Sequence, residues 1–120
     1  MTDTEPGRAD FTLMAILRIA RDTSGEAGLP LLETLRRSGY RDHRPRFGAP
    51  EVRAALSAHP TLIDEWLAYS EDKRTEAGWY VLRDGEIGQV LKPSAQRSYP
   101  TIEEAVAQFI VHELDYWAGL

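Results

Sequence analysis

The sequence predicts an α+β fold: a helical N-terminal half, followed by a β-hairpin or three-stranded antiparallel meander packed on a long C-terminal helix. Three observations predict this fold. Apolar residues recur at helical spacing up to about residue 74. An Asp-Gly step then stands between two β-prone runs in residues 79–91, which is a strong hairpin signal. Finally, one apolar stripe continues from Ile102 to Trp117 at helical spacing.

The chain of 120 residues is long enough for one domain with its own hydrophobic core. We expect residues 1–9 to be a flexible leader and residues 10–120 to form a single compact domain. The helical part spans about 10–74, and the hairpin-plus-helix part about 78–117. A composition of 42% hydrophobic and 28% charged residues is typical of a globular chain rather than a disordered one.

Four helices are predicted in the first half, over residues 11–21, 30–39, 50–58 and 60–74. Asp10 is suited to cap the first of them. Pro30 suits the first position of the second helix, and Gly39 suits the left-handed position that follows a helix end. Residues 41–50 show no hydrophobic period, so we expect them to form a loop between the second and third helices.

The hairpin is expected to close with a two-residue loop at Asp84 and Gly85. The resulting register pairs Arg83 with Glu86, Leu82 with Ile87, Tyr80 with Gln89 and Trp79 with Val90. Trp79 and Tyr80 then point to opposite faces of the sheet. Both faces carry apolar residues, so we expect either that both are covered or that one meets a partner. Residues 94–99 are expected to add a third strand after Pro93.

The last helix is the clearest element of the sequence. Thr101 and Glu104 have the spacing of a capping box at its start. Its apolar stripe consists of Ile102, Ala105, Val106, Phe109, Ile110, Leu114 and Trp117. We expect the three tryptophans, Trp66, Trp79 and Trp117, to join the fourth helix, the hairpin and the last helix in one core.

Composition limits the classes of function. The chain has no cysteine, which excludes disulfides, thiolate catalysis and cysteine-based metal sites. Its longest apolar run, residues 13–17, is too short to span a membrane, and its polar, acidic start does not resemble a signal peptide. We therefore expect a cytoplasmic protein without a membrane partner. A net charge of −5 disfavours nucleic-acid binding by the molecule as a whole.

No catalytic, metal or cofactor signature is present, so we expect a protein that is not an enzyme. His43, His59 and His112 show no ligand spacing, and no phosphate-binding loop or nucleophile motif occurs. An enzyme with His43 or His112 in a cleft is the least supported class of function. The charged run at 71–74 is interpreted as the solvated end of the fourth helix.

The charge is uneven along the chain. Residues 1–60 hold nine arginines against eight acids, whereas residues 61–120 hold five basic residues against eleven acids. The leading hypothesis is a non-enzymatic, acidic protein-binding module of inhibitor, immunity/antitoxin-like or adaptor type, a comparison of size and charge rather than of motif. Its partner is another protein. The candidate interface residues are Asp64, Glu65, Tyr69, Glu71, Asp72, Tyr80 and Glu86.

The alternative hypothesis is an anion- or nucleic-acid-binding regulator that uses residues 36–53, where six arginines stand against two acids. The candidate anion-binding residues are Arg36, Arg37, Arg41, His43, Arg44 and Arg46. A competing interpretation is that these arginines pair with the acidic half of the same molecule or are solvated. A homodimer through the hairpin edge or the last helix is compatible with either hypothesis.

Overall fold

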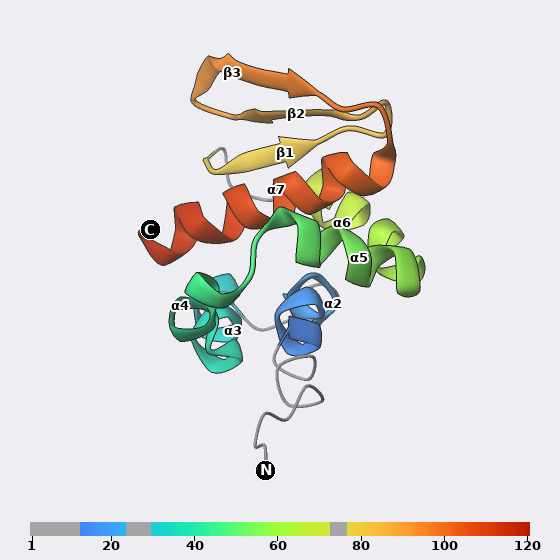
Figure 1. Cartoon of the computed structure of the whole chain (residues 1–120). Coiled ribbons are helices and arrows are strands. Elements are labelled where there is room, and N and C mark those ends of the chain that lie inside the picture. The colour runs from blue at the N-terminus through green and yellow to red at the C-terminus, as the bar shows by residue number, and fades with distance from the viewer. Residues whose placement is uncertain (1–12, 24–29, 73–76) are drawn as a thin grey trace.

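The computed structural model describes residues 13–23, 30–72 and 77–120. It confirms the α+β fold, with helices on one side of the long helix α7 and a three-stranded antiparallel sheet on the other (Figure 1). The predicted leader at 1–9, the cap at Asp10 and the end of the fourth helix at 73–74 lie outside the described residues. Among the described residues, no helix combines the length and the hydropathy that a membrane span needs.

The helical half contains most of the predicted helices. Residues 13–17 are helical, and the observed elements that follow are α2 (Ile19–Thr23), α3 (Leu31–Ser38), α4 (Tyr40–His43), the 3-10 helix η1 (Arg44–Arg46), α5 (Ala49–Ala58) and α6 (Thr61–Asp72). Gly39 ends α3 in the left-handed conformation, with φ of 73°, as its position predicted. Pro30 precedes α3 as its N-cap rather than lying inside its first turn.

The prediction that residues 41–50 form a loop is wrong, because two short helical elements, α4 and η1, occupy most of this segment. Neither element has a helical apolar period, since each is one turn long or shorter. Their stability comes from tertiary contacts: Tyr40 is buried, and Phe47 packs edge-on against it, with ring centroids 5.9 Å apart. Short helices of this kind depend on packing rather than on propensity.

The sheet consists of β1 (Trp79–Val81), β2 (Glu86–Gln89) and β3 (Lys92–Ser98), in the order β1-β2-β3. The predicted register is wrong by one residue. Trp79 pairs with Gln89, Tyr80 with Gly88, and Val81 with Ile87. The loop therefore has three residues rather than two, because the Gly85 amide donates to the Leu82 carbonyl at 3.0 Å and the Leu82 amide donates to the Glu86 carbonyl at 2.8 Å.

The corrected register also changes which residues share a face. Trp79, Val81 and Ile87 are all buried and form the face that packs on the helices. Tyr80 lies on the opposite face, so the prediction that Trp79 and Tyr80 point apart is confirmed. That outer face is less covered: Leu82 is 44% exposed, and no helix lies on this side of the sheet in Figure 1.

Helix α7 (Ile102–Ala118) is the central layer of the molecule (Figure 1). The Thr101 hydroxyl accepts a hydrogen bond from the Glu104 amide at 3.2 Å, which is one half of the predicted capping box. Phe109, Ile110 and Leu114 are fully buried. Trp66 of α6 is also fully buried, and its indole N–H donates to the Leu17 carbonyl at 2.9 Å, which ties α6 to the first helical segment.

Gly85 offers a direct test of the observed turn. Its φ is 96°, and a Cβ at this position would lie 2.6 Å from the Tyr99 carbonyl oxygen. We expect Gly85→Ala to lower the free energy of unfolding by about 2–4 kcal/mol, from left-handed strain and a forced backbone shift. Gly39→Ala is the matched control, because Gly39 is also left-handed but no atom lies within 4 Å of the place that a Cβ would take. Urea unfolding should show a loss of only about 1–2 kcal/mol for the control; equal losses would contradict the close approach of Tyr99.

Candidate functional site

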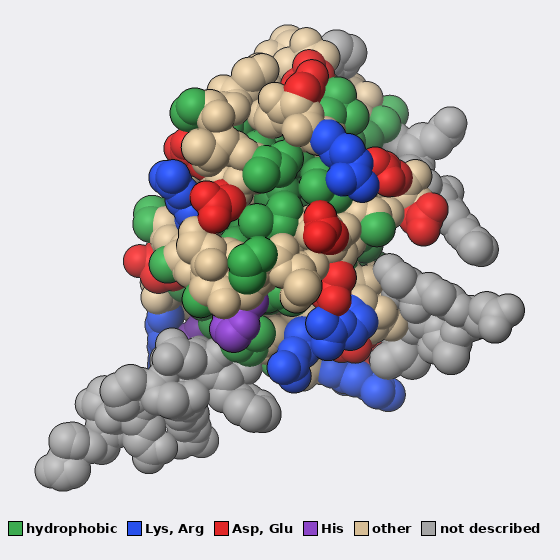
Figure 2. Space-filling model, turned by 90° about the vertical axis from the view of Figure 1, so that its right-hand side faces the viewer, with side chains coloured by type: hydrophobic (Ala, Val, Ile, Leu, Met, Phe, Trp, Pro, Cys, Tyr) green, Lys and Arg blue, Asp and Glu red, His purple; other side chains and the backbone are tan. Residues whose placement is uncertain are grey.

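The outer side of α6 carries a row of exposed carboxylates. Asp64, Glu71 and Asp72 are exposed and recur at spacings of seven and eight residues, which places them on one side of a helix. We call these three residues the acidic stripe. The opposite side of α6 is buried against the core. Figure 2 shows a side of the molecule on which hydrophobic side chains gather in the middle and acidic side chains lie around them.

Two acids of this region form ion pairs within the chain. Glu65 accepts hydrogen bonds from Arg21, at 3.0 Å from Nε and 2.7 Å from Nη2. Glu71 accepts one from Arg83 at 3.1 Å, and both of these side chains are more than half exposed. Such surface pairs contribute about 0–1 kcal/mol and exchange readily with other partners. Asp64 and Asp72 have no ion pair with any residue in the described part of the chain.

The acidic stripe adjoins the turn between β1 and β2. The Ser70 hydroxyl accepts from the Val81 amide at 2.9 Å and donates to the Val81 carbonyl at 3.1 Å, so α6 covers the outer edge of β1. The pair of Glu71 and Arg83 connects the stripe to the turn itself. Exposed Leu82 directly precedes Arg83, so the Glu71 end of the stripe has an exposed apolar residue close by in the chain. Interfaces commonly combine an apolar centre with a polar rim.

Tyr69, a predicted interface residue, is buried and does not belong to this surface. Its hydroxyl donates to Glu113 Oε2 at 2.7 Å. Burial, followed by the negative charge of Glu113, raises the pKa of Tyr69 far above its ordinary value, so the phenol stays protonated as a donor. The other oxygen of Glu113, Oε1, accepts from the Trp79 amide at 2.7 Å. Glu113 is fully buried and joins α6, β1 and α7.

Tyr80 and Glu86, two of the candidate interface residues, lie together on the outer face of the sheet. The Tyr80 hydroxyl donates to Glu86 Oε2 at 2.7 Å. The Gln96 side-chain amide donates to the Tyr80 hydroxyl oxygen at 3.2 Å and to Glu86 Oε2 at 3.0 Å. The ring of Tyr80 also covers Gly88, since a Cβ at Gly88 would lie 2.7 Å from the ring. This cross-strand contact gives Tyr80 a role in stabilising the sheet.

The outer edge of β3 is the exposed edge of the sheet, but its features limit pairing with another strand. Pro93 has no backbone N–H, Lys92 and Arg97 add charge, and the register with β2 is irregular between Ile87 and Gln89. These features do not favour a homodimer through this edge. The homodimer stays a prediction.

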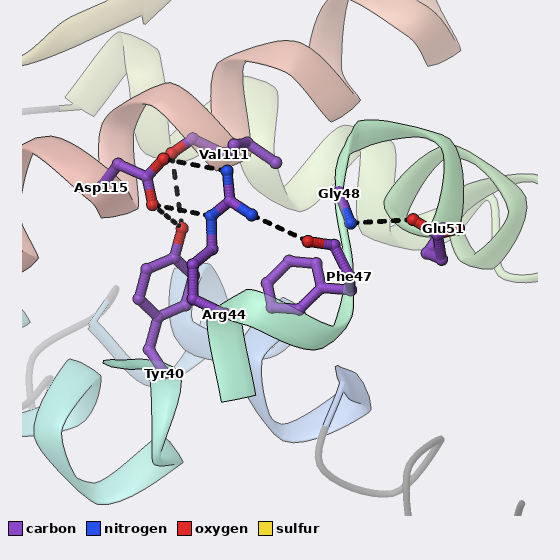
Figure 3. Close-up of polar contacts among 7 residues, drawn as sticks. All are labelled: Tyr40, Arg44, Phe47, Gly48, Glu51, Val111 and Asp115. Atoms are coloured by element: carbon purple, nitrogen blue, oxygen red, sulfur yellow. Dashed lines mark hydrogen bonds and ion pairs between the residues drawn. The ribbon is translucent and has the colours of Figure 1, made fainter. Parts of the chain in front are cut away.

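The Arg-rich segment is bound to the end of α7 through Arg44 (Figure 3). Its guanidinium contacts both oxygens of Asp115, with Nε 2.9 Å from Oδ1 and Nη2 3.1 Å from Oδ2. Its Nη1 donates to the Phe47 carbonyl at 2.8 Å, and the Tyr40 hydroxyl donates to the same Asp115 carboxylate at 2.5 Å. A two-pronged arginine–carboxylate contact of this type is among the strongest polar contacts in proteins.

Most of the other predicted anion-binding residues are also engaged. Arg36 and Arg37 both contact Glu33, and these hydrogen bonds lower the pKa of the Glu33 carboxyl. Arg41 donates to the Ala118 carbonyl at 3.0 Å. His43 stacks on Phe47 with ring centroids 5.4 Å apart.

Arg46 differs from the other arginines of the segment, since it is exposed and has no ion pair with a described residue. Of the candidate arginines, Arg44 pairs with an acid of the second half of the chain, Asp115, whereas Arg36 and Arg37 pair with Glu33 of the first half.

The described residues contain no group of three or more histidines and acids that could hold a metal ion. Neither His43 nor His112 lines the groove between α5 and α7 or the groove that α3 and α4 form with the end of α7. No protein-family model matches the sequence, and no curated protein or solved structure shows a significant similarity to it. The candidate site is therefore defined by its geometry.

The contact between Arg44 and Asp115 gives a prediction about stability. We expect Asp115→Asn to lower the free energy of unfolding by about 2 kcal/mol, because it removes the charge that Arg44 and Tyr40 contact in a partly buried position. Arg37→Gln is the control, since it breaks an exposed pair and should change stability by about 0.5 kcal/mol or less. Urea unfolding of the two variants measures both values, and similar losses would refute the role given to Asp115.

His112 gives a prediction about pH. It stacks on Trp79 with ring centroids 4.4 Å apart, and burial, followed by the charge of Arg97, lowers its pKa below the ordinary 6.5. The unfolded chain therefore binds a proton at a higher pH than the folded one. The contribution of neutral His112 to the free energy of unfolding should be fully present above pH 6.5 and should be lost as the pH drops below it.

His112→Phe keeps an aromatic ring against Trp79 and removes the titrating group. We expect it to reduce the difference between the urea midpoints at pH 7.5 and pH 5.5. Exposed His59→Gln serves as the control and should leave that difference unchanged. An unchanged pH difference in His112→Phe would show that His112 does not carry this dependence.

Proposed function

We propose that the protein is a non-enzymatic protein-binding module of inhibitor, immunity/antitoxin-like or adaptor type, whose acidic stripe meets a basic surface on its partner. The observation that carries this proposal is the state of the carboxylates on α6. Asp64 and Asp72 project from one side of the helix and have no ion pair with a described residue. By contrast, Glu65 and Glu71 of the same helix, and Glu33 and Asp115 of other helices, each contact an arginine of the chain.

The surroundings of the stripe supply the other requirements of an interface. Leu82 adds an exposed apolar side chain at the adjoining turn. Ala68, which lies between Asp64 and Asp72 on α6, is exposed and small, so the middle of the stripe is accessible. Charged side chains at a rim accelerate association and select partners, whereas a few apolar contacts supply most of the affinity. Because the pair of Glu71 and Arg83 is exposed, it can open at a small cost in free energy when a basic side chain of the partner contacts Glu71 instead.

The anion- or nucleic-acid-binding alternative stays a prediction with less support. Of its candidate residues, Arg36, Arg37, Arg41 and Arg44 already contact oxygen acceptors of the same chain. Arg46 and the nearby Arg53 are exposed, but two separate guanidinium groups do not form the continuous basic surface that nucleic-acid binding uses. Cytoplasmic location likewise stays a prediction.

Reversal of charge on the stripe tests the proposed function. Tagged protein recovers its partner from cells that produce both, and binding of the purified partner is then measured at 50 and 300 mM salt. We expect the double variant Asp64→Lys/Asp72→Lys to weaken binding at least about tenfold and to slow association, with a smaller effect at high salt because ions screen exposed charges.

The matched control is Asp22→Lys/Glu51→Lys, which makes the same change in net charge at two exposed acids outside the stripe and outside both grooves. It should leave most of the affinity intact. An equal loss in both double variants would mean that only net charge matters. Recovery of no protein partner at all, or binding that ignores both salt and the stripe, would refute the proposed function.

A further inference from the structure

A groove of about 370 Å³ lies where α3 and α4 meet the end of α7, and none of the acidic-stripe residues lines it. Its apolar lining is formed by Leu32, Leu35, Tyr40 and Trp117. Leu32 is 58% exposed, which is unusual for a large apolar side chain beside an aromatic surface. The groove is open rather than enclosed, which suits one or two side chains of a partner better than a fully enclosed small molecule.

The charged residues of this groove are mainly basic. Arg36 and Arg41 line it, and Asp42 is the acid among the lining residues. The Arg41 guanidinium is fixed by its hydrogen bond to the Ala118 carbonyl, at the end of α7. Arg36 also contacts Glu33, but Arg37 shares that carboxylate, so the groove and its immediate surroundings keep an excess of positive charge. This excess beside an apolar lining favours a ligand that combines an apolar group with a carboxylate.

Trp117 supplies an independent observation. Its indole N–H is buried, and no described residue offers it a hydrogen-bond acceptor. Buried tryptophan N–H groups normally find an acceptor, as Trp66 does at the Leu17 carbonyl. The donor is covered in the free protein, so an oxygen of a bound segment reaches it only if the ring turns toward the groove that Trp117 lines.

A second groove, of about 350 Å³ between α5 and α7, lacks this combination. Ala49, Ala54, Ser57 and Ala107 supply most of its lining, and its charges, Arg53 and Glu104, have opposite signs. It has neither a large exposed apolar side chain nor an unsatisfied donor among the described residues. The features of the first groove therefore do not follow from its size alone.

We propose that the groove of α3, α4 and α7 binds an acidic segment of a partner protein, with one large apolar side chain on Leu32 and Trp117 and a neighbouring carboxylate at Arg36 and Arg41. This inference goes beyond the proposed function, because it uses a different surface and a partner segment of opposite charge. The two surfaces can fail or succeed independently.

The probe is a fluorescein-labelled peptide, Ser-Asp-Asp-Leu-Phe-Glu-Asp-Ser, with an acetylated N-terminus and an amidated C-terminus. One control peptide replaces Leu-Phe by Ser-Ser, and a second replaces each acid by its amide. We expect each control peptide to bind at least about tenfold more weakly than the probe, because one lacks the apolar anchor and the other lacks the charge.

Paired variants of the protein separate this groove from the rest of the surface. Leu32→Ser should weaken binding of the probe about tenfold. Leu91→Ser, at an even more exposed leucine of the β2–β3 turn, should leave the affinity for the probe unchanged. Arg36→Gln should weaken it several-fold, and Arg37→Gln should not, although both arginines contact Glu33, because only Arg36 lines the groove.

A spectroscopic measurement tests the role of the indole donor. In a ¹H–¹⁵N correlation NMR spectrum, the Trp117 indole N–H signal should shift when the probe binds. The indole N–H signal of Trp66, which already donates a hydrogen bond to the Leu17 carbonyl, should stay in place. Trp117→Phe keeps an aromatic ring in the groove and should weaken the probe about threefold by removal of the donor.

Four outcomes would overturn the inference. The first three are absence of binding at 1 mM probe, equal loss in the two members of a variant pair, and a Trp117 signal that does not move when the probe binds. A dimer at the assay concentration whose contact covers Leu32, measured by sedimentation, would also overturn it, because a second copy would then be the occupant. Failure of Asp64→Lys/Asp72→Lys to change partner binding would refute the proposed function alone.

Discussion

Burial of α7 on two sides is the constraint on which the rest of the structure depends. The helix lies between the sheet and the helical layer, so it has to be apolar around most of its circumference (Figure 1). It nevertheless contains two acids near its C-terminal end, Glu113 and Asp115. Successive residues of a helix are rotated by about 100° around its axis. Glu113 and Asp115, two positions apart, therefore lie on nearly opposite sides of α7.

These two carboxylates connect the two layers to α7. Glu113 faces the sheet side and accepts from Tyr69 of α6 and from the Trp79 amide of β1. Asp115 faces the helical layer and contacts Tyr40 of α4 and Arg44 of η1. Each buried or partly buried charge is acceptable because its oxygens have donors. The polar contacts thus select which segments pack on α7, while apolar burial supplies the driving force.

The same contacts decide which charges remain at the surface. Arginines of the 36–46 segment are held by Glu33, Asp115 and the end of α7, so the most basic part of the sequence becomes largely a structural element. Asp64 and Asp72 of α6 have no comparable contact with a described residue, and they remain exposed. A surface that is acidic on α6 and Arg-lined at the groove follows from this distribution of partners.

Local patterns were sufficient where one element decides the outcome. Gly39 ends α3 because a left-handed residue is required there, and Thr101 caps α7 because its hydroxyl reaches the Glu104 amide. The hairpin was also predicted, but its register was not. Asp84 and Gly85 fit both a two- and a three-residue loop, and the distinction depends on the Tyr99 amide, which donates to the Gly85 carbonyl from beyond β3.

Glu113 shows the limit of the sequence pattern for the candidate site. It falls within the apolar stripe of α7, between Ile110 and Trp117, and a charged residue at such a position is the signal in the sequence for a buried carboxylate. The donors, however, lie 34 and 44 positions away in the chain. Tyr69 was therefore predicted at an interface, although it is the donor that Glu113 requires inside the protein.

The sequence by itself determined the fold class, the principal helices, the hairpin and the concentration of acids in the second half, because these depend on period, turn residues and composition. Only the tertiary structure decided the strand register, the helical form of residues 40–46, the burial of Tyr69 and the pairing of Arg44 with Asp115. The physical reason is that each of these depends on contacts between residues distant in the chain, which local spacing does not encode.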